Sequence, residues 1–110
     1  MMSSIEASRR QYYLEFFELC SFKRIFISKD LSYISVTTPD QNNNIVDAVI
    51  STYIGKNSGI IQEIRKGEIV VEEVIQDSND NWVKSKTLIA VNESGHITSC
   101  SKMDSVNAAL

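Results

Sequence analysis

The sequence contains few of the residues that mark specialised proteins, with four glycines, one proline, one histidine and two cysteines among 110 residues. So little glycine and proline excludes collagen-like and low-complexity chains. No apolar run approaches the roughly 20 residues that a membrane-spanning helix requires, and the N-terminus lacks the apolar core of a signal peptide. The chain is therefore expected either to be cytosolic or to start after a targeting segment that has been removed.

The shortage of histidine removes most catalytic and metal-binding arrangements. His96 is the sole histidine and lies in a polar turn, where a solvated loop residue is expected. Without a CxxC pair or a second histidine, a structural zinc site is excluded. Gly55 and Gly59 lack the Lys-Ser/Thr ending of a phosphate-binding loop, and Glu72 and Glu73 point to opposite faces of a strand. The sequence thus predicts no catalytic residue, no cofactor and no enzymatic activity.

The two cysteines, Cys20 and Cys100, lie far apart in the sequence. In a reducing compartment both would be free thiols, whereas in an oxidising compartment they could pair. Sequence alone does not give their distance in space, so both alternatives stay open.

Composition and charge indicate one small globular domain that does not bind nucleic acid. The chain is 43% apolar and 23% charged, with a net charge of -3, as expected for a single folded domain. Residues 31–80 contain three Lys or Arg against eight Asp or Glu. Because nucleic-acid affinity depends on clustered cations, this acidic middle argues against such a partner.

Residues 3–17 have helical character. Ser3 and Glu6 fit a capping box, and aromatic side chains cluster at helical spacing, namely Tyr12, Tyr13, Phe16 and Phe17. One interpretation is a terminal helix folded back on its own domain. The other is a segment that docks on a partner chain through these aromatics. We therefore treat residues 1–21 as a predicted N-terminal docking segment.

From residue 22 the apolar period changes to two, which is typical of strands. Six or seven short strands at hairpin spacing, without intervening helices, predict an all-β fold, a small antiparallel β-sandwich or barrel over residues 22–91. Residues 92–110 are predicted to be a polar tail, with a last strand around Ile97 left open. The predicted strand Trp82–Val91 allows a break near Ser85. The inward-facing positions form one predicted core: Ile25, Ile27, Ile34, Val36, Ala48, Ile50, Ile64, Ile69 and Val71.

Two further residues are expected to support the fold. Glu73 shares the phase of Ile69 and Val71, so it is interpreted as a carboxylate that accepts hydrogen bonds at the rim of the core. Trp82 is interpreted as an aromatic that fills the core or covers a sheet edge, with its indole N–H donating to a carbonyl.

The second half of the chain resembles a known family. The relevant features are YIGKNSGII (Tyr53–Ile61), the acidic strand EIVVEEVI (Glu68–Ile75), then Trp82 and the closing IAV (Ile89–Val91). In order and spacing they resemble the C-terminal domain of PilP, an inner-membrane lipoprotein of type IV pilus assembly. Upstream, LEFFELCSFKRIF (Leu14–Phe26) is similar to the segment that leads into the first strand of that domain.

The sequence also departs from the family pattern. Ser51 and Thr52 stand where Gly-Asp is usual, Ser85 stands where the family has Arg, and Cys20 replaces an Asp. These departures suggest a divergent branch, and a homology-region domain of a type II secretion system stays open as an alternative. A small cytosolic β-barrel that binds a ligand is the second alternative.

The resemblance implies a periplasmic adaptor, anchored at the inner membrane in the full-length protein through an upstream segment. Its implied partners are the periplasmic domain of the outer-membrane secretin and the inner-membrane platform proteins. The resemblance implies roles in holding the fold for Gly55, Gly59, Glu73 and Trp82. Contact with a partner is implied for Lys23, Arg24 and Ile25 at a sheet edge.

Overall fold

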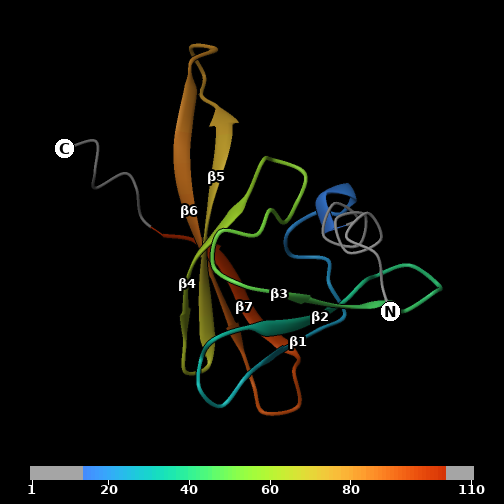
Figure 1. Cartoon of the computed structure of the whole chain (residues 1–110). Coiled ribbons are helices and arrows are strands. Elements are labelled where there is room, and N and C mark those ends of the chain that lie inside the picture. The colour runs from blue at the N-terminus through green and yellow to red at the C-terminus, as the bar shows by residue number, and fades with distance from the viewer. Residues whose placement is uncertain (1–13, 104–110) are drawn as a thin grey trace.

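The computed structural model describes residues 14–103. They form two antiparallel sheets and one short 3-10 helix, which confirms the all-β prediction (Figure 1). The elements in chain order are η1 (Leu14–Phe16), β1 (Arg24–Ile27), β2 (Ile34–Thr37), β3 (Ile45–Ala48), β4 (Ile60–Arg65), β5 (Glu68–Gln76), β6 (Trp82–Val91) and β7 (Ile97–Lys102).

The first sheet is a three-stranded meander in the order β1-β2-β3. Its first turn is organised by Asp30, whose carboxylate accepts hydrogen bonds from the Ser32 hydroxyl at 2.6 Å and the Ser28 hydroxyl at 2.9 Å. These hydroxyls, Ser32 foremost, hold the pKa of Asp30 below its ordinary value. The turn thus fixes the register that pairs Ile27 with Ile34.

The second sheet has four strands in the order β4-β5-β6-β7. Strands β5 and β6 are the longest and pair continuously from Glu68 opposite Ala90 to Gln76 opposite Trp82. Figure 1 shows their joined ends projecting beyond the other strands. We refer to this projecting part, residues 75–83, as the arm.

The core lies between the sheets, where alternate residues of each strand point inward. Most of the predicted core is confirmed, with seven positions buried and Ile27 partly buried against them: Ile25, Ile34, Val36, Ala48, Ile64, Ile69 and Val71. The prediction for Ile50 is wrong, since its side chain is 50% exposed. Strand β3 ends at Ala48 and Ser51 adopts a φ of 83°, so the alternation stops before residue 50.

Two predicted boundaries also change. Strand β7 spans Ile97–Lys102 and pairs with β6. The prediction of a tail is therefore wrong for these residues, and the last strand that the sequence allowed around Ile97 is present. Its residues are polar because an edge strand with one exposed face needs few apolar side chains. Strand β6 runs unbroken through Ser85. Of the helix predicted over residues 3–17, the described part contains only the 3-10 turn Leu14–Phe16. Residues 3–13, with Ser3 and Glu6, lie outside the described residues.

Candidate functional site

The described part of the N-terminal segment, residues 14–21, packs against the sandwich. Leu14, Leu19 and Phe22 are all buried in the core. The Leu14 carbonyl accepts a hydrogen bond from the Gly55 amide at 3.0 Å, so the loop before β4 holds η1 in place. The described fold therefore includes residues 14–21, which precede the predicted boundary at residue 22.

The aromatic residues of this segment divide into two groups. The ring of Phe17 packs edge-on against that of Phe22, with 6.0 Å between centroids, and so contributes to the fold. The side chain of Phe16 is 56% exposed. Tyr12 and Tyr13 lie outside the described residues.

A disulfide joins Cys20 to Cys100, with 6.0 Å between their Cα atoms. The sequence left this pairing open. The bond ties the segment before β1 to strand β7 at the opposite end of the chain. Cys100 is partly buried and packs against the hydrophobic core, whereas Cys20 is exposed.

The three residues predicted for partner contact lie at and just before the start of β1, in different environments. The ammonium group of Lys23 donates hydrogen bonds to the Asp40 carbonyl at 3.3 Å and to the Asn43 side chain, so it stabilises the loop after β2. Arg24 is exposed and available to a partner. Ile25 is fully buried, so its side chain cannot contact a partner. Arg24 and Ile25 differ in exposure because successive side chains of a strand point to opposite faces of the sheet.

The two loop glycines occupy positions that a larger residue would strain. Gly55 adopts a φ of 86°, and an added Cβ would lie 3.2 Å from the Cβ of Leu19. At Gly59 an added Cβ would overlap the carbonyl oxygen of Ile54. Gly55 thus allows the loop to close against Leu19 of the N-terminal segment, and Gly59 allows it to turn back against Ile54.

Glu73 is the one buried charged residue among those described, with 4% of its surface exposed. Its carboxylate accepts hydrogen bonds from the Thr87 hydroxyl at 3.1 Å and the Asn57 amide at 3.2 Å. The ammonium group of Lys102 lies 3.8 Å away. These three partners join strands β5, β6 and β7 to the loop before β4, which is a structural arrangement at the rim of the core.

Trp82 does not fill the core, because its side chain is 69% exposed. It pairs with Gln76 near the end of the arm, beyond the region that the three-stranded sheet covers (Figure 1). The sequence does not show how far the hairpin projects, so a core position for Trp82 was one of its two predicted placements.

A surface with several exposed apolar side chains lies on the three-stranded sheet. Alternation places one set of side chains on the face that points away from the core, which we call the outer face. Four of its residues are large, apolar and between 41% and 65% exposed: Phe26, Tyr33, Ile45 and Val49. Ser35 and Asp47 lie among them, with the Ser35 hydroxyl donating to the Asp47 carboxylate at 2.7 Å. Exposed apolar side chains gathered on one face are typical of protein interfaces.

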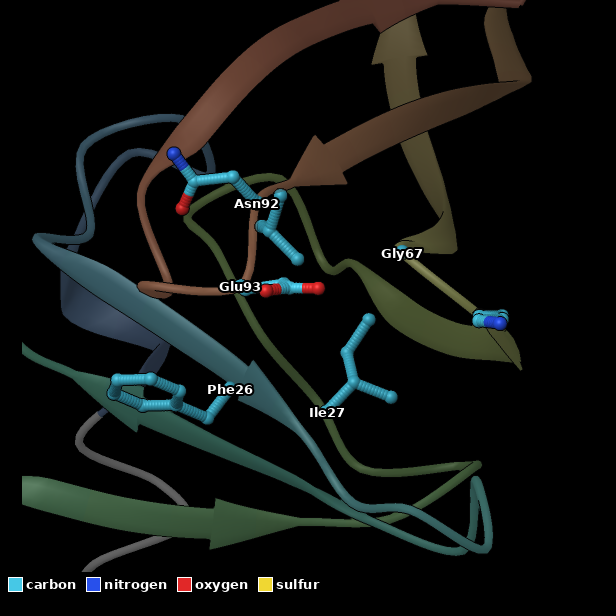
Figure 2. Close-up of a pocket in the computed structure, with 7 residues that line it drawn as sticks. Phe26, Ile27, Gly67, Asn92 and Glu93 are labelled. Atoms are coloured by element: carbon cyan, nitrogen blue, oxygen red, sulfur yellow. The ribbon is translucent and has the colours of Figure 1, made fainter.

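A cleft of about 240 Å³ lies where β1 meets the turns that follow β4 and β6. In Figure 2, Ile27 and Glu93 face this space. The cleft is smaller than the pockets of about 300–1,000 Å³ that usually hold cofactors, and it can admit one apolar side chain. Its lining combines apolar and charged residues: Phe26, Ile27, Lys66, Gly67, Val91, Asn92 and Glu93.

A scan against protein families identifies the fold's relatives. The family of the pilus assembly protein PilP matches residues 2–91. The chain belongs to the PilP family. Among curated proteins no match was found. The PilP assignment confirms the resemblance inferred from Tyr53–Ile61 and the segments around it.

Two solved PilP structures share the fold. One is a domain of the type IV pilus biogenesis lipoprotein PilP from Pseudomonas aeruginosa, with 21% identity and a TM-score of 0.56, covering 72% of this chain and 90% of that one. The other is the solution structure of PilP from Pseudomonas aeruginosa, with 22% identity and a TM-score of 0.57, covering 74% and 72% respectively. The two-sheet sandwich is therefore the PilP domain fold.

Neither a candidate metal site nor a candidate membrane-spanning helix is found among the described residues. Residues 14–103 contain no group of three or more His, Cys, Asp or Glu positioned to hold a metal ion. Over the same range, no helix has the length and apolarity to cross a membrane. What the PilP fold presents here is an apolar outer face, a small cleft and a projecting arm.

Proposed function

We propose that this chain is a non-enzymatic adaptor of type IV pilus biogenesis that joins the inner-membrane assembly platform to the outer-membrane secretin. Membership in a family of pilus assembly proteins supports the proposal. The observation that carries it furthest is the outer face, where four large apolar side chains are exposed on a rigid sheet. A surface of this kind is suited to binding a folded protein partner.

The proposal locates the protein in the periplasm, held at the inner membrane in its full-length form. The Cys20–Cys100 disulfide supports this location. Disulfides persist in oxidising compartments such as the bacterial periplasm and are rare in the cytosol. The disulfide therefore favours the adaptor over a small cytosolic β-barrel.

The two partners are assigned to different parts of the chain. We assign the platform proteins to the N-terminal segment that contains Tyr12 and Tyr13, and the secretin to the sandwich. Leu14 is buried, and its carbonyl accepts a hydrogen bond from the Gly55 amide, so residue 14 itself is held on the body. Arg24, exposed at the start of β1, is assigned to the secretin contact.

Removal of residues 1–13 tests this assignment without cutting into the core at Leu14. The truncated chain should keep its thermal midpoint and its affinity for a purified periplasmic region of the secretin, while losing binding to the periplasmic regions of the platform proteins. Equal loss of both contacts would show that the segment serves the fold instead.

A charge reversal tests the second contact. Arg24→Glu should weaken secretin binding more at low salt than at high salt, because salt screens exposed charges. Lys29→Glu, an exposed cation in the next turn, is the matched control and should have little effect. Equal effects of both variants would argue for nonspecific attraction.

A further inference from the structure

The sandwich has four edge strands, β1, β3, β4 and β7, and two of them are already covered. On β4, the Ile61 amide donates to the Thr52 carbonyl at 3.1 Å, and its carbonyl accepts from the Ser51 amide at 2.8 Å. On β1, the Ile25 amide donates to the Gly95 carbonyl at 2.8 Å. A partner strand would have to displace these bonds before it could pair with β1 or β4.

Strand β3 has an uncovered edge. The Thr38 amide donates to the Asn44 carbonyl at 2.9 Å, so Asn44 and every second residue after it bond toward β2. The amide and carbonyl groups of Ile45 and Asp47 therefore point away from the sheet. Within residues 14–103, none of these four amide and carbonyl groups has a backbone hydrogen-bond partner on the side away from β2. Unpaired groups of this kind are a template for an added strand.

The side chains along β3 distinguish it from β7, whose outer edge is also unpaired among the described residues. Exposed side chains on β7 are polar, for example Ser99 and Ser101. Ile45 on β3 is 65% exposed, and Val49 just after the strand is 49% exposed. A strand added to β3 would bury these apolar groups, and burial of apolar surface drives association.

The negative charge of Asp47 indicates which side chains a strand added to β3 would carry. Asp47 lies between Ile45 and Val49 on the outer face, and its described partner is the neutral hydroxyl of Ser35. None of the ion pairs formed by the described residues involves Asp47. A basic side chain would compensate this carboxylate, while apolar side chains would match its neighbours.

We propose that the outer edge of β3 binds an extended strand of the secretin's periplasmic region, which carries a basic residue between two apolar residues on the outer face. This inference rests on the proposed adaptor function and names the edge through which the sandwich binds. Main-chain hydrogen bonds to Ile45 and Asp47 would give affinity, and the basic residue opposite Asp47 would set the register.

Two variants test the edge with a purified periplasmic region of the secretin from the same organism. Ile45→Pro removes the outward amide and leaves the bonds between β2 and β3, since proline is tolerated where the amide points to solvent. Asp47→Lys reverses the charge. Each should weaken binding about tenfold or more without lowering the thermal midpoint. Glu63→Lys, the same charge change at an exposed residue of β4 in the other sheet, is the control and should change binding less than about twofold.

A synthetic peptide with valine, lysine and valine on one face, acetyl-Thr-Val-Thr-Lys-Thr-Val-Thr-amide, probes the edge without the secretin. Its addition should shift the amide NMR resonances of residues 45–49 in the parent chain and not in Ile45→Pro. If the secretin binds and neither β3 variant weakens it, the inference is wrong while the adaptor function stands. If the secretin does not bind, the adaptor function is contradicted, and the peptide shifts alone decide whether the edge accepts a strand.

Discussion

Cys20 and Cys100 are bonded across almost the whole length of the chain, 80 positions apart in sequence. The bond fixes the segment before β1 to the last strand of the second sheet. Because the segment also buries Leu14 and Leu19, the disulfide locks one end of the molecule's core in place.

Loss of this bond should destabilise the fold substantially. By the chain-entropy model, closing a loop of this length contributes about 4 kcal/mol to the free energy of unfolding. The double variant Cys20→Ser with Cys100→Ser should lose that amount in urea denaturation, and reductant should affect the parent chain alone. Equal stability of parent and variant in oxidising buffer would contradict a formed disulfide.

Aspartate at two apolar positions should have opposite consequences. Val71 is fully buried, so Val71→Asp places a carboxylate in the core at a cost of several kcal/mol and should unfold the chain. Ile50 is half-exposed, so Ile50→Asp should fold with a thermal midpoint close to that of the parent. Circular dichroism melts of both variants check this, and unfolding by Ile50→Asp would show that β3 continues its alternation.

Trp82→Ala should leave the stability nearly unchanged, because its side chain is 69% exposed. As the sole tryptophan, Trp82 also reports on the arm by fluorescence. Its emission should match that of indole in water and be fully accessible to iodide. A blue-shifted emission, or a large loss of thermal stability in the variant, would place the side chain in the interior.

Two adjacent acids on β5 should differ sharply. Glu73→Ala leaves the buried Thr87 hydroxyl without its partner, which should cost about 1–3 kcal/mol of unfolding free energy. Glu72 pairs with exposed Lys84 at 3.9 Å, so Glu72→Ala is the matched control and should cost less than about 1 kcal/mol. Urea denaturation measures both, and similar losses would rule out a special role for Glu73.

Period-two alternation was sufficient to predict the strands and most of the core, since it depends only on which residues are apolar. It failed where the backbone leaves the strand, as at Ile50 after the end of β3. A core placement of Trp82 is wrong as well, because its strand passes beyond the opposing sheet. Both failures concern the extent of an element, which tertiary packing sets and local sequence does not.

The candidate site was predictable only in part. The phase that put Asp47 outward also put Ile45 and Val49 outward, so the outer face was present in the pattern. The sequence could not show that the β1 edge is covered at Ile25 by Gly95, because these residues are 70 positions apart and meet only in the folded chain. It likewise could not decide the pairing of Cys20 with Cys100.

The central claim is that one chain holds platform and secretin at the same time. The most direct test immobilises the periplasmic regions of the platform proteins and measures retention of the secretin's periplasmic region in surface plasmon resonance. The account predicts that the secretin is retained only after this chain has been loaded. When a chain without residues 1–13 is applied in its place, the secretin should not be retained. Release of the loaded chain on addition of the secretin would mean that the two partners compete for one surface, and that result would contradict the adaptor.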